Sequence, residues 1–312
     1  MKPPLEAPAA GLSTSDQPDF VQSFARGLTV IEAFDREHAA MTLSEVARRA
    51  GLTRAAARRL LLTLCELGYA QTDGRLFSLR PRVLNLGFAY LHAQGIWDLA
   101  QPFLVELVER IHESCSIAVL DGRDIVYVAR VPTRTRIMSI NLGIGSRLPA
   151  HATSLGRVLL AALPGAELDA LLSEAAPLPA YTERTVTDPA ELARRIAQVR
   201  RDGWCILDQE LELGLRSIAV PLCGPGGQVV AALNAGLQAS RFTLDAMRQR
   251  VLPEMLQAAA QISAALGAPT QAPALPSLPA APSGRPPAPR RARPPAAATR
   301  PAATGRERPP RR

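Results

Sequence analysis

The chain has 312 residues, more than one ordinary domain requires, and a formal net charge of +8 at pH 7. Residues 268–312 carry nine arginines and one acid, so the excess charge comes from this tail and residues 1–267 are neutral overall. No apolar run is long enough to cross a bilayer and residues 1–19 lack the apolar centre of a signal peptide, so we expect a cytoplasmic protein without a membrane partner.

Proline is frequent at both ends of the chain. Residues 1–19 contain four prolines, and residues 268–312 are rich in Pro, Ala and Arg, with few large apolar side chains to bury. We expect both segments to be disordered. Two interpretations of the tail stay open: it adds nonspecific affinity for nucleic acid, or it is a neutral extension.

Residues 20–81 have the pattern of a winged helix-turn-helix, which reads double-stranded DNA in the major groove. In the first helix, an apolar stripe is expected to cap the core; it consists of Phe24, Leu28, Ile31 and Phe34. Thr42 and Glu45 fit a capping box at the start of the second helix, which breaks at Gly51.

The third helix is expected to be the recognition helix. Thr53 is a good N-cap, and the helix ends before Gly68. Small and cationic side chains face outward near its start, where the backbone can approach the groove and arginines can reach phosphates or guanine edges. With neighbouring positions, the predicted contacts to promoter DNA are Ser44, Thr53, Arg54, Ala55, Ala56, Arg58, Arg59, Arg75 and Arg80.

A wing follows this helix. Asp73-Gly74 separates two alternating runs and predicts a tight hairpin turn with positive φ at both residues. Residues 42–82 carry eight arginines and three acids, a local excess of positive charge that favours contact with DNA. The alternative is a plain helical hairpin with a solvated charged face, which the wing and the first helix disfavour.

Residues 82–96 predict a linker helix with apolar side chains on more than one side. Such a helix often packs against a copy of itself, and DNA readers with one recognition helix per chain usually bind two half-sites as dimers. The sequence therefore predicts a homo-oligomer.

Residues 97–267 predict an α+β domain with a sheet flanked by helices. Helical periodicity covers 99–113, and period-two alternation follows from Ser116. Further strands are expected over 136–142, 204–207, 217–222 and 229–237, a loop over 145–149, and helices after His151, after Asp188 and from Thr243 to about Leu266.

Polar residues in this domain indicate where a small acid binds. The segment 153–156 places hydroxyls and free amides at a helix start, which suits a carboxylate. Arginine forks can neutralise an acidic ligand. The candidates for the ligand site are Arg134, Arg136, Arg147, His151, Ser154, Gly156, Ser217 and Asn234. Ordinary caps and turns are the alternative for the hydroxyls, a satisfied edge-strand amide for Asn234, and a structural hydrogen bond for His151.

An enzyme is the rival from another functional class. Ser154 and His151 lie three residues apart without a nucleophile elbow, a poor geometry for a dyad. The four cysteines and four histidines have no metal-ligand spacing. We therefore expect no catalytic residue, metal or cofactor. A second rival, a structural DNA-binding protein without a ligand, does not account for a sensor-sized domain of about 170 residues, a size typical of a whole domain.

Along residues 20–266 the chain resembles the IclR family of bacterial transcriptional regulators. The motifs that carry the resemblance are Thr42–Ala47, Gly51–Thr53, Leu64–Tyr69, Pro149–Arg157, Asp208–Leu211 and Gly214–Pro221. Three further segments resemble the subgroup that controls genes of the β-ketoadipate pathway: Arg136–Ser139, Gly145–Pro149 and Ala231–Asn234.

The resemblance implies a GAF-like effector domain, a dimer or tetramer, and effector-dependent promoter binding. It also implies an effector pocket lined by Ser154, Leu155, Leu215, Ser217, Asn234 and Gly236. Relatives that sense small oxoacids carry a cysteine at the place of Ser217 and serines at those of Asn234 and Gly236, so a larger aromatic or dicarboxylic acid is expected here. The alternative is a regulator of an unrelated catabolic pathway with a different small acid.

Overall fold

The computed structural model of the chain describes residues 19–133, 142–174 and 177–269. Most of the strand predicted over 136–142 lies outside these residues, as do the terminal segments 1–18 and 270–312. Within the described residues, none of the helices combines the length and the apolar character that a bilayer crossing requires.

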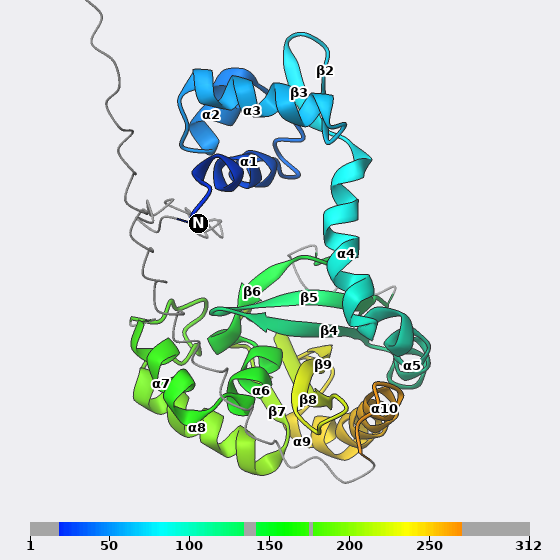
Figure 1. Cartoon of the computed structure of the whole chain (residues 1–312). Coiled ribbons are helices and arrows are strands. Elements are labelled where there is room, and N and C mark those ends of the chain that lie inside the picture. Colours follow the sequence, from blue (N-terminus) through cyan, green and yellow to red (C-terminus); the bar gives the residue numbers. More distant parts are fainter. Residues whose placement is uncertain (1–18, 134–141, 175–176, 270–312) are drawn as a thin grey trace, which may run out of the picture. The chain divides into compact units, whose positions relative to one another are not determined.

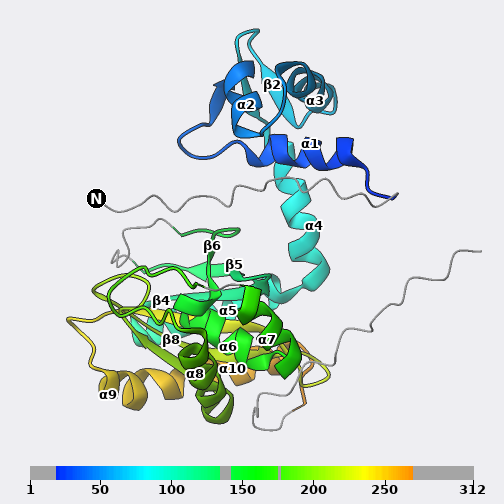
Figure 2. The same ribbon diagram turned by 90° about the vertical axis from the view of Figure 1, so that its left-hand side faces the viewer.

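The N-terminal part contains three helices and a small antiparallel sheet with strand order β1-β3-β2 (Figure 1). Its elements are α1 (Gln22–Glu32), β1 (Ala40–Thr42), α2 (Leu43–Arg49), α3 (Arg54–Glu66), β2 (Ala70–Thr72) and β3 (Leu76–Leu79). Figure 2 shows the β2–β3 hairpin projecting beside α3. The predicted winged helix-turn-helix is confirmed.

Side-chain caps start both helices of the helix-turn-helix, as predicted. The Thr42 backbone N–H donates to Glu45 Oε2 over 2.8 Å, and the Glu45 N–H donates to Thr42 Oγ1 over 3.4 Å, which completes the capping box. The Ala56 N–H donates to Thr53 Oγ1 over 3.2 Å at the start of α3. Gly51, with a φ of 64°, takes the left-handed conformation that the turn between the helices requires.

The predicted turn of the wing is wrong in its detail. Gly74 has a φ of 93°, but Asp73 does not have positive φ. The loop holds three residues between β2 and β3, one more than a two-residue hairpin turn. Asp73 Oδ1 accepts the N–H groups of Arg75 and Leu76 over 2.9 and 2.7 Å, so the side chain closes the turn and one left-handed residue suffices.

The apolar stripe predicted on α1 is wrong at two positions. Val30 and Ala33 are the buried residues, with Ile31 and Phe34 packed against the same core. Phe24 is 69% exposed and Leu28 is 41% exposed. The helix is therefore rotated from the expected orientation, and part of its apolar surface faces solvent.

The predicted linker helix is present as a 3₁₀ turn, η1 (Pro81–Val83), followed by α4 (Leu84–Gln94). As expected, its apolar side chains are not confined to one face: large exposed side chains are Leu84, Leu86, Phe88 and Tyr90. The next helix, α5 (Ile96–Ile111), begins three residues before the helix expected over 99–113.

The C-terminal domain is built on a six-stranded antiparallel sheet with order β6-β5-β4-β9-β8-β7. Its strands are β4 (Ser114–Asp121), β5 (Asp124–Val131), β6 (Arg147–Pro149), β7 (Cys205–Asp208), β8 (Leu215–Cys223) and β9 (Val229–Gln238). The β6 strand corrects the loop expected over 145–149, because residues 147–149 pair with the edge of β5. The α+β class is confirmed, and the arrangement fits a GAF-like domain.

Helices cover both faces of this sheet (Figure 1). One apolar core joins a sheet face to α6 (Ser154–Ala162), α7 (Gly165–Glu174) and α8 (Pro189–Asp202), with the 3₁₀ turn η2 (Ala150–Ala152) before α6. The second core joins the opposite face to α5 and α10 (Leu252–Ala265). The helix predicted after Asp188 is α8, in which Asp188 is the N-cap and Pro189 occupies the first position.

The single helix predicted from Thr243 to Leu266 is interrupted. It comprises α9 (Leu244–Ala246), a π-helical turn (Met247–Val251) and α10. Pro253 has no amide hydrogen, and its ring clashes with the carbonyl four residues earlier in a regular α-helix. The wider π turn accommodates this break immediately before the proline.

Glu113, between α5 and β4, is a fully buried carboxyl group. Burial raises the pKa of Glu113 because it penalises the charged form, while the Arg241 guanidinium, 3.1 Å from Oε1, lowers it in part. The net shift is upward. Glu113 therefore favours folding when protonated, and this contribution is lost as pH rises from the unfolded value near 4.5 through the folded pKa.

We predict that Glu113→Gln removes the loss of folding stability that ionisation of Glu113 causes as pH rises. The melting temperature of the variant minus that of the unmodified chain is expected to increase as pH rises from 4 to 8, because only the unmodified chain ionises a buried group. Calorimetry at a series of pH values measures this difference. A difference that stays constant over the range contradicts the assignment.

Candidate nucleic-acid interface and effector site

The arginines of α3 are free to contact an external anion. Arg54, Arg58 and Arg59 are exposed, and no carboxylate among the described residues pairs with them. Ala55 is also exposed, whereas Ala57, Leu61 and Leu64 on the opposite side of the helix are buried. The helix thus presents cations and a small side chain outward, the combination expected of a helix that enters a DNA groove.

The remaining predicted DNA contacts also lie at the surface. Ser44 in α2, Thr53 at the α3 cap, Arg75 in the wing and Arg80 after it are exposed, and Ala56 is half-buried. By contrast, two nearby arginines have internal partners. Arg49 Nη2 lies 2.5 Å from Asp35 Oδ2, and Arg82 Nη1 donates to the Leu67 carbonyl over 2.8 Å.

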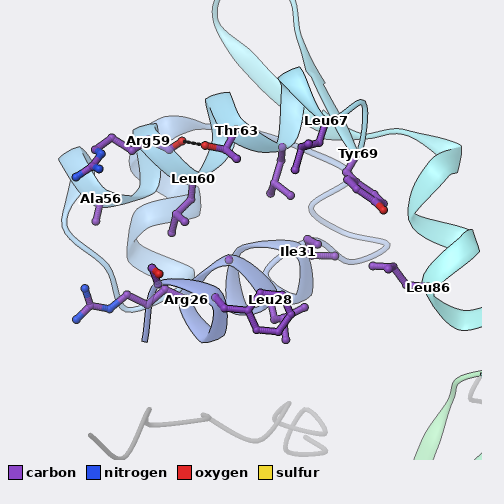
Figure 3. Close-up of a pocket in the computed structure, with 14 residues that line it drawn as sticks. Arg26, Leu28, Ile31, Ala56, Arg59, Leu60, Thr63, Leu67, Tyr69 and Leu86 are labelled. Carbon is purple, nitrogen blue, oxygen red and sulfur yellow. Dashed lines mark hydrogen bonds between the residues drawn. The ribbon is translucent and has the colours of Figure 1, made fainter. Parts of the chain in front are cut away.

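An apolar groove of about 610 Å³ lies between α1 and α3, at the edge of the core that the two helices share (Figure 3). Leu28 and Ile31 line it from α1, Leu60 lines it from α3, and Leu86 of α4 lies at one end. Leu67, the residue after α3, also lines it. Arg26 and Arg59 also line the groove. Arg59 therefore borders both the outer surface of α3 and this groove.

Polar residues lie side by side across the sheet of the C-terminal domain, on the face that α6 covers. Arg130 of β5 pairs with Ser116 of β4, which pairs with Asn234 of β9. One step along the sheet, Gly236 pairs with Ser217 of β8. Directly paired residues share a face of a sheet. Three predicted effector residues, Ser217, Asn234 and Gly236, are therefore neighbours on one face.

The first turn of α6 packs directly on the preceding backbone. Leu155 is fully buried in the core between α6 and the sheet. A Cβ atom added at Gly156 would lie 2.1 Å from the Ala150 carbonyl oxygen, so only glycine allows η2 and α6 to pack this closely. Thr153 caps the helix by accepting the Gly156 N–H over 3.1 Å. The structure gives Gly156 a packing role.

Two buried polar atoms near this packing lack partners. Ser154 Oγ and Asn234 Oδ1 are inaccessible to water and have no hydrogen-bond partner among the described residues. Buried polar atoms in folded proteins are rarely left unpaired. They come from α6 and from the sheet face that α6 covers, and Leu215 is buried on β8 of the same sheet. This is the part of the domain best suited to a bound polar ligand.

Other predicted effector residues are placed differently. The His151 ring nitrogen Nε2 lies 3.0 Å from the Pro179 carbonyl, and burial lowers the pKa of this imidazole, so the ring makes a structural hydrogen bond. Arg147 pairs with Asp121 and Asp124 at 2.5 and 3.2 Å, so its charge is already neutralised inside the chain. Arg134 and Arg136 lie outside the described residues.

A buried ion pair positions the start of α6. Arg157 Nη2 lies 2.5 Å from Glu210 Oε2, and the two side chains are 2% and 8% exposed. Arg157 Nε also donates to the His151 carbonyl, and Glu210 Oε2 accepts the Val186 N–H. These bonds connect α6 to the loop between β7 and β8, which leads into Leu215 and Ser217.

Sequence reasoning missed Arg130 and Ser116. Ser116 begins the predicted period-two segment, but nothing in the local pattern distinguishes its hydroxyl from an ordinary strand serine. Their proximity to Asn234 depends on the register of three strands, which a single sequence does not specify. Arg157 and Glu210 appeared only within motifs of the resemblance.

Two family models match the chain. The model described as the IclR helix-turn-helix domain matches residues 23–74, and the model described as the C-terminal domain of the bacterial transcriptional regulator IclR matches residues 88–264. The chain belongs to the IclR family. This confirms the predicted family and excludes the enzyme alternative, because IclR proteins are transcriptional regulators.

Relatives of the predicted subgroup are among the most similar IclR proteins. The chain is 47% identical over 260 residues to the Pca regulon regulatory protein of Pseudomonas putida, covering 83% of this chain and 89% of the relative. It is 38% identical over 239 residues to the p-hydroxybenzoate hydroxylase transcriptional activator of Acinetobacter baylyi, covering 75% and 88%.

Solved IclR structures share the fold. A putative transcriptional regulator from Rhodococcus sp. RHA1 is 51% identical, with a TM-score of 0.71, covering 79% of this chain and 98% of the other. An IclR homologue from Microbacterium hydrocarbonoxydans in complex with 4-hydroxybenzoate is 28% identical, with a TM-score of 0.69, covering 78% and 98%.

We predict that Arg157→Ala lowers the free energy of unfolding by about 3–5 kcal/mol, because it leaves the Glu210 carboxylate buried without its partner. Urea denaturation followed by circular dichroism measures the loss. The matched control is Arg195→Ala, which removes an exposed pair with Glu191 and is expected to cost less than about 1 kcal/mol. Equal losses in the two variants would show that the buried pair does not stabilise the domain.

Proposed function

We propose that this chain regulates genes of aromatic-acid catabolism in response to a small acid. The observation that carries the proposal is the 47% identity to the Pca regulon regulatory protein over most of both chains. The IclR homologue in complex with 4-hydroxybenzoate supports an aromatic acid as the effector class. A dicarboxylic acid such as β-ketoadipate is the other member of the predicted class.

Promoter DNA is the proposed partner of the N-terminal part. The unpaired arginines of α3 supply contacts to phosphates and base edges, and the wing arginine Arg75 supplies a further phosphate contact. We infer that the regulator acts in the cytoplasm, where bacterial promoter DNA is accessible.

We further propose that the regulator is a homo-oligomer. The apolar side chains of α4, such as Leu84 and Phe88, are 60% and 46% exposed in the single chain. Exposed apolar surface of this kind commonly marks a protein–protein interface. Two recognition helices held by one dimer also fit the two half-sites that helix-turn-helix proteins usually read.

Replacing Arg58 by Ala is expected to weaken binding to promoter DNA by about 1–3 kcal/mol, because one cation leaves the groove-facing side of α3. A mobility-shift titration with DNA flanking the regulator's own gene measures this change. Arg194→Ala, an exposed arginine of the effector domain, is the control and should bind as the unmodified chain does. If Arg58→Ala binds equally well, α3 does not contact DNA through this residue.

Protocatechuate, 4-hydroxybenzoate or β-ketoadipate is expected to raise the melting temperature, because a ligand that binds only the folded state stabilises it by about 2.7 kcal/mol at 100 times its Kd. A thermal-shift titration of the full chain with each acid measures the effect, with benzyl alcohol as an uncharged aromatic control. No stabilisation by any of the three acids would contradict the proposed effector class and leave the IclR family assignment intact.

A further inference from the structure

Arg130 of β5 contrasts with three arginines of the same domain that are paired with carboxylates. Arg147, Arg157 and Arg216 each lie within ion-pair distance of an aspartate or glutamate. Arg130 has no carboxylate partner among the described residues. Its Nη1 donates one hydrogen bond, to Ser116 Oγ over 3.0 Å.

The position of Arg130 makes this lack of a partner informative. Arg130 is half-buried, and Ser116, its hydrogen-bond partner, is only 1% exposed. A cation that is partly removed from water loses hydration, so such groups are usually paired. Arg130 pairs with Ser116 in the sheet and donates to its hydroxyl, so the two side chains lie on the same face.

The neighbours of Arg130 on the sheet supply polar groups without charge. Ser116 pairs with both Arg130 and Asn234, so a guanidinium, a hydroxyl and an amide follow one another across three strands. Within the described part of the chain, Asn234 Oδ1 has no hydrogen-bond partner, and Ser154 Oγ on the covering helix has none either. The sheet face and the helix that covers it thus bring together, among the described residues, a guanidinium without a carboxylate partner and two side-chain oxygens without hydrogen bonds.

We propose that Arg130, held in place by Ser116, binds the carboxylate of the effector, and that Asn234 and Ser154 receive its other polar groups. This rests on the proposed function, which makes the effector an acid. Ser116 uses one of the five N–H donors of the guanidinium, which leaves enough for a forked contact with two carboxylate oxygens. Ring hydroxyls of an aromatic acid are donors that match the unpaired oxygens of Asn234 and Ser154.

Arg130 therefore determines specificity for acids over neutral analogues. Without Arg130, Asn234 and Ser154 would bind 4-hydroxybenzamide and 4-hydroxybenzoate equally, because both compounds offer them the same ring hydroxyl. The guanidinium adds an interaction that only the carboxylate ion makes at full strength, because hydrogen bonds between charged groups are stronger than neutral ones.

Isothermal titration of the full chain with 4-hydroxybenzoate and with 4-hydroxybenzamide at pH 7.5 tests the proposal. The unmodified chain is expected to prefer the acid. Arg130→Gln should weaken acid binding about 10- to 100-fold, as expected for loss of a hydrogen bond to a charged group, with little effect on the amide. The matched control is Arg147→Gln, which removes an arginine of the same sheet that is already paired with two aspartates. It should keep the preference.

Two further variants cover the case in which Arg130→Gln does not fold. Arg130→Lys keeps the charge and loses the fork, so it should retain part of the preference for the acid. Ser116→Ala leaves the charge and removes only the group that positions it, so the acid should bind more weakly while the preference persists. Circular dichroism without ligand establishes that each variant is folded.

The outcomes separate this inference from the proposed function. If the unmodified chain binds the acid and folded Arg130→Gln binds it with unchanged affinity, Arg130 is not the carboxylate anchor and the proposed function stands. If Arg130→Gln does not fold, the same conclusion follows when Arg130→Lys and Ser116→Ala both bind the acid with unchanged affinity. If the unmodified chain binds none of the aromatic or dicarboxylic acids, the proposed function fails and this inference fails with it. Equal loss of acid and amide binding would indicate a structural role and overturn the specificity claim.

Discussion

The ion pair between Arg157 and Glu210 is the constraint on which the arrangement of the proposed effector site depends. Two charges removed from water are tolerated only when their geometry is good and further hydrogen bonds satisfy them. Here the His151 carbonyl and the Val186 amide supply those bonds. The pair thereby fixes the first turn of α6 and the loop before β8 with respect to each other. Gly156 allows the close packing that this arrangement needs.

Ion pairs within the chain determine which arginines remain available to a ligand. Several arginines of the effector domain are neutralised by carboxylates of the same chain, so they contribute to the fold and offer little to a ligand. The arginines of α3, and Arg130 on the sheet, lack such partners among the described residues. Unpaired charge is thus available on α3, the predicted recognition helix, and on the sheet face where an acid is proposed to bind.

Local features were predictable from the sequence, whereas long-range placements were not. The caps at Thr42 and Thr53 depend on residues within one turn, and each is present as expected. The prediction of positive φ at Asp73 was wrong because it assumed a two-residue turn, and the length of a loop depends on the register of the strands around it. The rotation of α1 and the adjacency of Arg130 to Asn234 depend on packing between distant segments, which periodicity does not determine.

The most direct test of the central claim is whether DNA binding and acid binding are coupled in one molecule. The affinity for promoter DNA should be measured by fluorescence anisotropy at increasing 4-hydroxybenzoate or protocatechuate, and the affinity for the acid with and without DNA. A regulator of this kind predicts a change in DNA affinity of roughly 5- to 150-fold, and the same factor in the reciprocal measurement. Binding of both partners with no change in either affinity would contradict it.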